Sequence, residues 1–397
     1  MRGKCLIYLL HFLAKINMTQ FFEGIHIFFQ IVLFTLAAAF IVEMLYYLAL
    51  YSKAGRKPQN NPNPNPNHPA VSIIICAKNE ANNLRNNLSF VLEQNYRDFE
   101  VIVVNDCSED ETEDVLSELK VRYPHLNITS IAKDRKFSHG KKLALTVGIK
   151  AAKNEWLLMT DADCRPISEN WIATMADNFT DEKEIVIGYG GYERKKGLLN
   201  NMVRFDTVNI AMQYLSYAIS GKPYMGVGRN IAYRKSSFFN NKGFASHYHV
   251  ASGDDDLFVN EVATKKNTIV EYRPEAHTLS QPSVTFNAWF AQKKRHLTTA
   301  KYYRPKFKFL LSFELIFRFL FYVAFISLCF HPELYLIGIG TYVVRSFVRL
   351  LVLKNVMKRL NEKDLLLPSL LYDVIIPVVN MILGIVNAVS SNRNTWK

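Results

Sequence analysis

The sequence predicts an α/β protein whose central domain holds a mainly parallel sheet and whose two ends lie in a membrane. Windows of about 20 apolar residues, the length a helix needs to cross a bilayer, occur near both ends of the chain. Strand-like and helix-like segments alternate through the middle, which is typical of parallel sheets covered by helices on both faces. The strand-like segments end in polar residues, and ligands of such sheets bind at the carboxyl ends of the strands.

The apolar windows lie on both sides of the central domain. The first covers Ile25–Leu50 and is interrupted only by Gln30 and by Glu43 near one end. A shorter apolar stretch with a basic start, at 5–13, lacks a small-residue cleavage site, so we expect a membrane-associated leader. Three further windows follow the central domain, over residues 307–330, 333–353 and 365–389.

Ionisable residues inside a membrane window are costly unless they are paired. Glu314 and Arg318 are four residues apart, so they are expected to pair on one helix face. Arg345 and Arg349 are expected to pair with Asp373, and binding of a lipid phosphate is the alternative.

The net charge of +13 is concentrated beside the apolar windows, in residues 53–57, 293–308 and 354–363. Basic belts of this kind face anionic lipid on the cytoplasmic side of a membrane. The charge therefore predicts a cell-membrane (inner-membrane) protein with a cytoplasmic central domain, and it argues against nucleic acid as a partner. If the first window is a single span, the N-terminus lies outside.

Missing motifs exclude several classes of protein. The five cysteines form no C-x-x-C pair, so a zinc site or a disulfide framework is not expected. A P-loop is absent, and so is a complete G-x-G-x-x-G after the first strand, which argues against a P-loop kinase and a dinucleotide oxidoreductase. The lone G-x-G at Gly226–Gly228 is interpreted as a tight turn with close backbone approach.

The elements of the central domain follow in order. Apolar runs predict strands, and the polar residues after them predict where the strands end. The segments between the strands show helical periodicity and are predicted to be helices. The expected strands are Val71–Cys76, Val101–Val104, a segment within 127–134 and Trp156–Met159, and the expected helices start near Ala81, Thr112 and Lys141.

Acidic residues follow two of these strands, Asp106 after one and Asp161 with Asp163 after another. Residues i and i+2 of an extended segment point the same way, so Asp161 and Asp163 are expected to face one point in the crevice. Carboxylate oxygens suit Mg²⁺ or Mn²⁺, which commonly also bind substrate phosphates. The sequence therefore predicts a divalent-metal site; a polar strand end that caps the next helix is the alternative.

Seven motifs occur in an order that resembles family-2 glycosyltransferases with the GT-A fold, in the branch of cellulose and hyaluronan synthases. They cover residues 70–296 and read VSIIICAKNEANNL, FEVIVVNDCSEDET, HGKKLAL, TDADC, GVGRNIAYRK, KGFASHYHVASGDDDLF and QKKRH. The resemblance implies a nucleotide-diphosphate-sugar donor, a divalent metal and inversion at the anomeric carbon.

The resemblance also implies a set of donor-binding residues. Asp106 matches the carboxylate that contacts the nucleoside, and Ala77, Asn79 and Glu80 match the neighbouring donor loop. Lys141 matches the basic residue near the donor.

The later acidic residues match the metal motif and the general base. Asp161 and Asp163 correspond to the metal motif, with Asp161 also beside the donor. Asp254 falls on the general-base position, where Gly253 replaces the usual Glu, and like charges around Asp254 are expected to raise its pKa. Asp255 is interpreted as a bystander and Asp256 as a supporting acid or helix cap. Leu257 and Phe258 are expected to begin a buried helix that fixes the base.

The segment Gln292–His296 resembles the Q-x-x-R-W motif of membrane-bound polysaccharide synthases, with His296 in place of Trp. This segment and Asp256 are expected to contact the acceptor and the diphosphate. Gln292 is expected to contact the acceptor, and Arg295 is expected to stabilise the charge that develops on the diphosphate. An interfacial amphipathic helix whose basic residues meet lipid headgroups is an equal alternative.

The chain is thus expected to have five parts: residues 1–52 with one main span at about 25–50; an Asn/Pro linker, 53–69; a GT-A domain, 70–290; a basic interfacial helix, 291–308; and a C-terminal membrane region with about three spans, 309–397. The expected activity is sugar transfer to a lipid-linked or glycan acceptor. A processive polysaccharide synthase, a catalytically silent scaffold for envelope enzymes and a nucleotidyltransferase are the alternatives.

Overall fold

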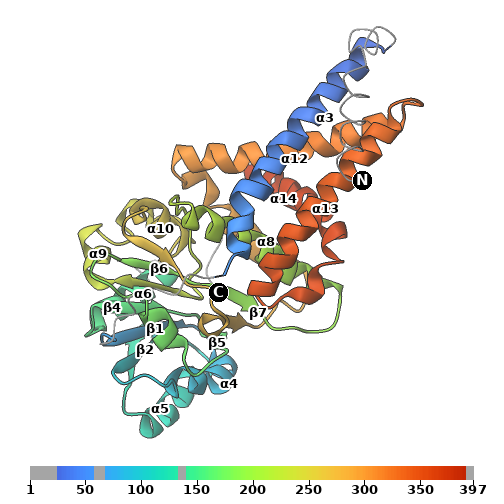
Figure 1. The fold of residues 1–397 in the computed structure, drawn as a ribbon. Coiled ribbons are helices and arrows are strands. Elements are labelled where there is room, and N and C mark those ends of the chain that lie inside the picture. The colour runs from blue at the N-terminus through green and yellow to red at the C-terminus, as the bar shows by residue number, and fades with distance from the viewer. Residues whose placement is uncertain (1–24, 58–67, 133–139, 390–397) are drawn as a thin grey trace, which may run out of the picture. The chain divides into compact units, whose positions relative to one another are not determined.

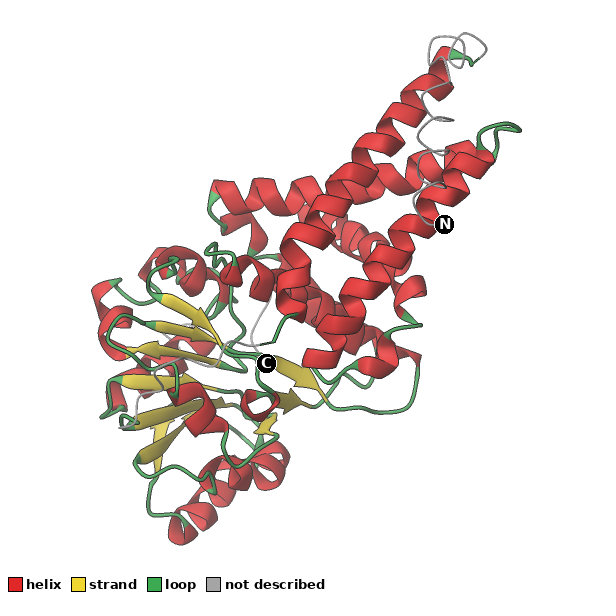
Figure 2. Cartoon of the chain, in the orientation of Figure 1, coloured by secondary structure: helices red, strands yellow, loops and turns green. Residues whose placement is uncertain are grey.

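The computed structural model describes residues 25–57, 68–132 and 140–389 (Figures 1 and 2). The predicted leader at 5–13 and most of the Asn/Pro linker lie outside the described residues. The chain divides into two compact units, one of residues 48–310 with 350–397 and the other of residues 1–47 with 311–349.

The larger unit contains a seven-stranded sheet in the order β3-β2-β1-β4-β8-β6-β9, and Figure 2 draws the strands in yellow. The first four strands of that order are mutually parallel, β8 is antiparallel to both of its neighbours, and β9 is parallel to β6. This confirms the predicted mainly parallel α/β fold. The strands are β1 (Val71–Ala77), β2 (Phe99–Asp106), β3 (Leu126–Ile131), β4 (Trp156–Met159), β6 (Ile185–Ile187), β8 (Ile231–Arg234) and β9 (Thr268–Val270).

Helices cover both faces of this sheet. Every residue of β1 is buried, as the apolar run predicted. Ile73 and Ile75 belong to a core with α4, α5 and α7, whereas Ile74 faces Gly148 of α6 on the other side. The helices of this unit are α4 (Ala81–Leu92), α5 (Thr112–Arg122), α6 (Lys141–Ala151), α7 (Trp171–Ala176), α8 (Leu198–Ile219), α9 (Lys235–Asn240), α10 (Asp256–Val262), α11 (Phe286–Leu297) and α14 (Ser369–Val389).

A second, three-stranded sheet has the order β5-β10-β7, with β10 antiparallel to β5 and parallel to β7. Its strands are β5 (Cys164–Pro166), β7 (Gly190–Tyr192) and β10 (Thr278–Ser280). Because β5 follows β4 after a short turn, the acidic residues of that turn lie between the two sheets.

Single-turn helices connect the larger elements. They are η1 (Tyr46–Leu50), η2 (Tyr51–Gly55), η3 (Ala245–His247), η4 (Pro274–Ala276), η5 (Ala300–Tyr302) and η6 (Lys363–Leu365).

Among the described residues, three helices are long and apolar enough to cross a membrane. They are the run of residues 27–55, in which α3 (Ile27–Leu45) continues through η1 and η2, then α12 (Pro305–Cys329) and α13 (Tyr335–Arg359). In the smaller unit, Leu36 and Ala39 of α3 pack with Phe321 and Ala324 of α12.

Two ion pairs lie within the smaller unit, as the cost of unpaired charge in a membrane favours. Arg318 pairs with Glu314 one turn away, as predicted. Arg345 pairs with Glu43 at 2.6 Å, a partner that the sequence did not suggest. The two side chains of this second pair lie 302 positions apart in the chain.

The fourth apolar window forms α14, which contains Pro377. Its apolar part, Ser369–Gly384, is shorter than the three candidate spans, and the helix packs against α8 and α11 of the larger unit. A fourth membrane span therefore stays a prediction.

Candidate active site

The carboxyl ends of β1, β2 and β4 meet at one edge of the sheet, since Ala77 lies beside Asn105 and Ile74 beside Met159. Two loops at this edge are bonded to each other. The backbone N–H of Asn79 donates to Ser108 Oγ at 2.9 Å, and its side-chain oxygen accepts from the N–H of Glu109 at 2.8 Å. Asn79 adopts a left-handed φ of 56°, which its short polar side chain tolerates.

The other donor-loop residues lie around these contacts. Ala77 and Asp106 are fully buried at their strand ends. The N–H of Glu80 donates to Thr112 Oγ1 at 3.0 Å, and burial raises the pKa of its carboxyl group. The two predicted donor-binding loops thus form one preorganised surface, although the Asn79 side chain is occupied by the protein itself.

Asp161 and Asp163 lie in the turn between β4 and β5. The turn is closed by the N–H of Cys164, which donates to the carbonyl of Asp161 at 3.0 Å. A carboxylate oxygen of each aspartate and Sγ of Cys164 all lie within 4.8 Å of one another. The carboxylates converge because of this turn, so the expectation of an extended segment was wrong.

The electrostatics of this turn suit a cation. Burial raises the pKa of Asp163, and the charge of Asp161 raises it further. Two hard oxygen donors with excess negative charge fit a divalent ion such as Mg²⁺ or Mn²⁺.

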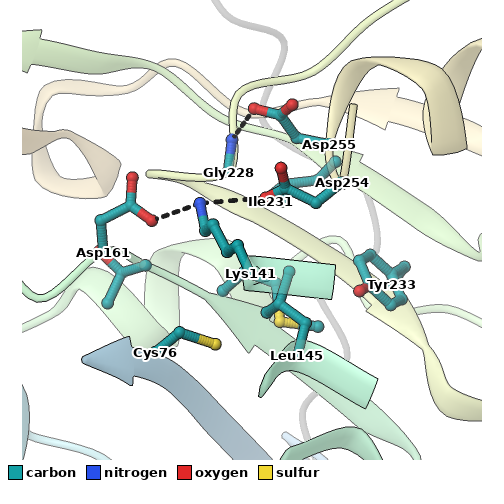
Figure 3. A pocket seen from close by; sticks show the side chains of 11 residues that line it. Cys76, Lys141, Leu145, Asp161, Gly228, Ile231, Tyr233, Asp254 and Asp255 are labelled. Carbon is teal, nitrogen blue, oxygen red and sulfur yellow. Dashed lines mark hydrogen bonds and ion pairs between the residues drawn. The ribbon is translucent and has the colours of Figure 1, made fainter. Parts of the chain in front are cut away.

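Lys141 is the first residue of α6 and lies between the turn of Asp161 and the acidic cluster Asp254–Asp256 (Figure 3). Its Nζ lies 2.8 Å from Oδ1 of Asp161 and 3.0 Å from Oδ2 of Asp254. Burial would lower the pKa of Lys141, but the carboxylates of Asp161 and Asp254 raise it well above its usual value. Three residues predicted separately from the sequence are therefore in direct contact.

The expected rise in the pKa of Asp254 was wrong. Burial does raise this pKa, but the charge and hydrogen bond of Lys141 outweigh burial and lower it overall. The prediction from sequence considered only the charges of the neighbouring aspartates. Lys141 is 113 positions away in the chain, so its effect could not be predicted.

Asp255 has the role that was expected of Asp256. Its carboxylate accepts from the N–H of Asp256 at 2.7 Å, which caps α10, and from the N–H of Gly228 at 2.6 Å. Burial and the charge of Asp254 raise the pKa of Asp255 to about 7. The interpretation of Asp255 as a bystander is corrected, because it ties the GVGRN turn to the start of α10.

Asp256 is buried and bonded to the protein through both oxygens. Oδ1 accepts from the N–H of Leu257 at 2.8 Å. Oδ2 accepts from the hydroxyl of Thr299 and, at 2.7 Å, from that of Tyr303. Leu257 and Phe258 are buried in α10, which confirms the predicted helix behind the acidic cluster.

Helix α11 carries the Gln292–His296 motif and is anchored to the larger unit. Gln292 donates to the hydroxyl of Tyr192 at 3.1 Å, and Lys293 forms a buried 2.6 Å ion pair with Asp206. Arg295 is half-buried, and His296 as a residue is exposed. The basic residues of this helix therefore do not all face lipid, because Lys293 points into the protein.

The sequence analysis missed Arg229 and Tyr192, which stack on each other with 4.5 Å between the guanidinium carbon and the ring centroid. Arg229 belongs to the quoted GVGRN motif, but its position depends on the pairing of β8 with β4. That pairing joins segments about 70 residues apart, so only a prediction of strand order could have found it.

A mainly parallel sheet with acidic residues at the ends of β2 and β4 has the general form of an α/β enzyme whose ligand binds at the carboxyl ends of the strands. Models of two families match the chain: glycosyl transferase family 2 over residues 72–239, and glycosyl transferase family group 2 over residues 156–382. The second match covers more than half of the chain. The chain belongs to the family-2 glycosyltransferases.

Curated relatives agree with this family. The chain is 26% identical to a probable glycosyltransferase, YdaM of Bacillus subtilis, over 60% of this chain and 57% of that protein. It is 32% identical to the poly-beta-1,6-N-acetyl-D-glucosamine synthase of Staphylococcus epidermidis, over 23% of this chain and 21% of that protein. In both cases the match spans less than two thirds of the relative.

Among solved structures, a mannosyltransferase from Pyrobaculum calidifontis in complex with GDP-Man and Mn²⁺ has a TM-score of 0.56 and 18% identity. The alignment covers 87% of this chain and 98% of that one. At this identity the likeness shows the fold.

Proposed function

We propose that this protein is an inverting, metal-dependent glycosyltransferase that moves a sugar from a nucleotide-diphosphate-sugar to a lipid-linked or glycan acceptor. The observation that carries the proposal is the contact of one ammonium group, that of Lys141, with both Asp161 and Asp254. A donor-side carboxylate and a candidate base thus lie on opposite sides of a single side chain, at the sheet edge where the nucleoside loops end.

Asp254 is the proposed general base. The acceptor hydroxyl loses its proton to Asp254 while its oxygen forms a bond to the anomeric carbon. The bond from that carbon to the diphosphate breaks on the opposite face, and the nucleoside diphosphate leaves with the electron pair. One displacement inverts the configuration at the anomeric carbon.

Asp161 and Asp163 would hold the Mg²⁺ or Mn²⁺ ion. Their proximity and the raised pKa of Asp163 support this assignment, since a bound cation relieves the mutual repulsion. When bound, the ion neutralises charge on the diphosphate.

Lys141 holds Asp254 in its ionised form before substrate enters. Its ion pair lowers the pKa of Asp254, which weakens that carboxylate as a base. We propose that donor diphosphate competes for the ammonium group of Lys141. A shift of Lys141 toward the diphosphate would leave Asp254 a stronger base when the acceptor arrives.

The remaining residues are assigned by their neighbours. Ala77, Asn79, Glu80 and Asp106 would form the nucleoside pocket through their backbone and buried carboxylate. The site of the acceptor would lie beside α11, with Gln292, Arg295 and His296 as the contacting residues.

The catalytic unit is proposed to face the cytoplasm at the inner membrane, because basic residues flank the candidate spans. Lipids of that membrane would contact the three apolar helices. Analysis of product length would separate single addition from a processive synthase, which here would lack the usual Trp at the position of His296.

The test is Asp254→Asn in the full chain, purified in detergent and assayed with nucleotide sugars and membrane lipid extract. Loss of a general base is expected to reduce turnover by about 10²- to 10⁴-fold. Mn²⁺-dependent nucleotide binding, followed by thermal shift, should persist. Asp114→Asn is the matched control, since it makes the same substitution at an exposed position of α5. Full activity of Asp254→Asn would refute the assignment of the base.

A further inference from the structure

Arg229 lies close to the turn that contains Asp161, just beyond the paired ends of β4 and β8. β4 and β8 are antiparallel, with Met159 beside Ile231. Just beyond this pairing, the hydroxyl of Thr160 donates to the carbonyl of Arg229 at 3.0 Å, which holds the GVGRN turn beside the turn that contains Asp161. Two segments of opposite charge therefore meet at the carboxyl end of β4.

The backbone of Arg229 is fixed on two sides. Its carbonyl accepts from Thr160 Oγ1 at 3.0 Å and from Thr278 Oγ1 at 3.1 Å. Gly190 provides room for the side chain, because a Cβ at that position would lie 3.0 Å from Cβ and 3.4 Å from Nε of Arg229. The side chain then stacks on the ring of Tyr192.

The guanidinium group of Arg229 keeps most of its donors available. Its one side-chain hydrogen bond within the described part of the chain is a long one, 3.5 Å, to the carbonyl of Gly191. No carboxylate among the described residues forms an ion pair with it. An arginine has five N–H donors, so this side chain can still bind an anion at two oxygens.

The surroundings keep Arg229 charged. Burial would lower its pKa, but Tyr192, Cys164 and the carboxylates of Asp163 and Asp161 raise it. The guanidinium group of Arg229 lies near the carboxylates of Asp161 and Asp163 but forms no ion pair with them. A space between groups of opposite charge is left there. A diphosphate with its metal ion would complement both groups, because the cation would face the carboxylates and the phosphate oxygens would face the guanidinium.

The geometry points to Arg229 as a residue that binds the diphosphate of the nucleotide-sugar and stabilises it as it departs. When the bond from the anomeric carbon to the diphosphate oxygen breaks, the electron pair remains on that oxygen. The guanidinium donates hydrogen bonds to the charge that develops there. This inference rests on the proposed function.

Tyr192 connects this cation to the acceptor side. The ring of Tyr192 stacks on the guanidinium group of Arg229, and its hydroxyl accepts a hydrogen bond from Gln292 of α11. Diphosphate binding at Arg229 and acceptor binding at α11 thus share one side chain.

The test compares nucleoside diphosphates with monophosphates. Full-length wild type, Arg229→Gln and Arg229→Lys are titrated by calorimetry with both phosphates of uridine, guanosine, adenosine, cytidine and thymidine, with Mn²⁺. Arg122→Gln removes the same charge from the exposed end of α5 and serves as the control.

We expect Arg229→Gln to weaken diphosphate binding about tenfold to a hundredfold, the usual effect of losing a charged hydrogen-bond donor. Monophosphate binding should change less than about twofold, and Arg229→Lys should lie between Arg229→Gln and wild type.

Equal loss for monophosphate and diphosphate, or no loss for either, would overturn the role of Arg229. A neutralising role alone predicts a different result: Arg229→Gln would bind Mn²⁺ more tightly, as measured by electron paramagnetic resonance without nucleotide, and would keep the full preference for diphosphate. That result also overturns the inference. If wild type binds no diphosphate more tightly than its monophosphate, the proposed function itself fails.

Discussion

The Nζ atom of Lys141 lies 3.0 Å from Oδ2 of Asp254, and this ion pair reverses the pKa shift that burial alone would give the carboxylate. The same ammonium group contacts Asp161, so it occupies a position between the candidate metal ligands and the candidate base. Both contacts bear on how the site accepts a metal.

Lys141→Met should make the protein respond more strongly to Mn²⁺. Without the ammonium group, Asp161 and Asp254 lose their shared counter-ion, and the unfolding temperature without metal should fall. Mn²⁺ then replaces the lost charge, so the rise in unfolding temperature on adding Mn²⁺ should exceed that of wild type. Lys141→Arg, which keeps the charge, should resemble wild type. An equal metal response in Lys141→Met would show that Lys141 and the metal do not compete.

Gly228→Ala should reduce turnover while the fold is retained. A Cβ at Gly228 would lie 3.3 Å from Nζ of Lys141, which is tighter than Cβ contacts normally are, and 3.4 Å from Oδ2 of Asp255. The Lys141 ammonium would have to move by a few tenths of an ångström, which misplaces the group between Asp161 and Asp254. Turnover should fall about tenfold or more.

The matched control is Gly140→Ala, since no atom of the described residues lies within 4 Å of a Cβ there and its φ is an extended −166°. Circular dichroism would verify the fold of both variants. Equal activity of the two would contradict the steric argument.

Asp256→Asn and Tyr303→Phe should destabilise the larger unit non-additively. The hydroxyl of Tyr303 donates to the buried Asp256 at 2.7 Å, so Tyr303→Phe removes this hydrogen bond and Asp256→Asn removes the acceptor charge that strengthens it. A hydrogen bond to a charged group contributes about 1.5–3 kcal/mol. Urea unfolding of the four forms of the double-mutant cycle should give a coupling energy of about 1 kcal/mol or more.

The cycle also tests a link between the segment of the proposed base and the segment that leads into α12. Tyr303 lies just before α12, whereas Asp256 lies two residues after Asp254. Additive effects would mean that this hydrogen bond does not hold the two segments together.

Acid should destabilise the protein partly through His277. The ring is buried against Tyr189, its Nε2–H donates to the carbonyl of Tyr272 at 2.9 Å, and burial lowers its pKa to about 4. The unfolded chain binds this proton near pH 6.5, so it takes up more protons than the folded state between about pH 6.5 and 4. Stability should therefore fall as the pH falls through this window, by up to about 3 kcal/mol from this residue.

His277→Gln keeps a donor for Tyr272 and removes the titration. The unfolding free energy of this variant should depend less on pH between 6.5 and 4 than that of wild type. His247, whose pKa burial also lowers to about 4, should supply part of the remaining dependence. An unchanged pH profile in His277→Gln would argue against the buried neutral ring.

Much of the fold followed from local pattern. The strand Trp156–Met159 was predicted with its observed bounds, because four large apolar residues between polar breaks fit a strand buried on both faces. The helix from Lys141 was likewise found from its apolar periodicity. The turn that joins Asp161 and Asp163 was not, because carboxylate convergence depends on backbone angles that no residue pattern encoded.

The sequence by itself determined the family, the mainly parallel sheet, the apolar helices and the identity of the acidic residues, since these depend on short-range patterns of residue type. Only the tertiary structure decided that Lys141 bridges Asp161 and Asp254, that Asp255 accepts from the N–H of Gly228, and that Arg229 lies beside the turn of Asp161 and Asp163. These relationships join residues far apart in the chain. The charges and pKa values of these residues depend on contacts of about 3 Å. Those contacts are set by the order of the strands in the sheet, and residue type alone does not determine them.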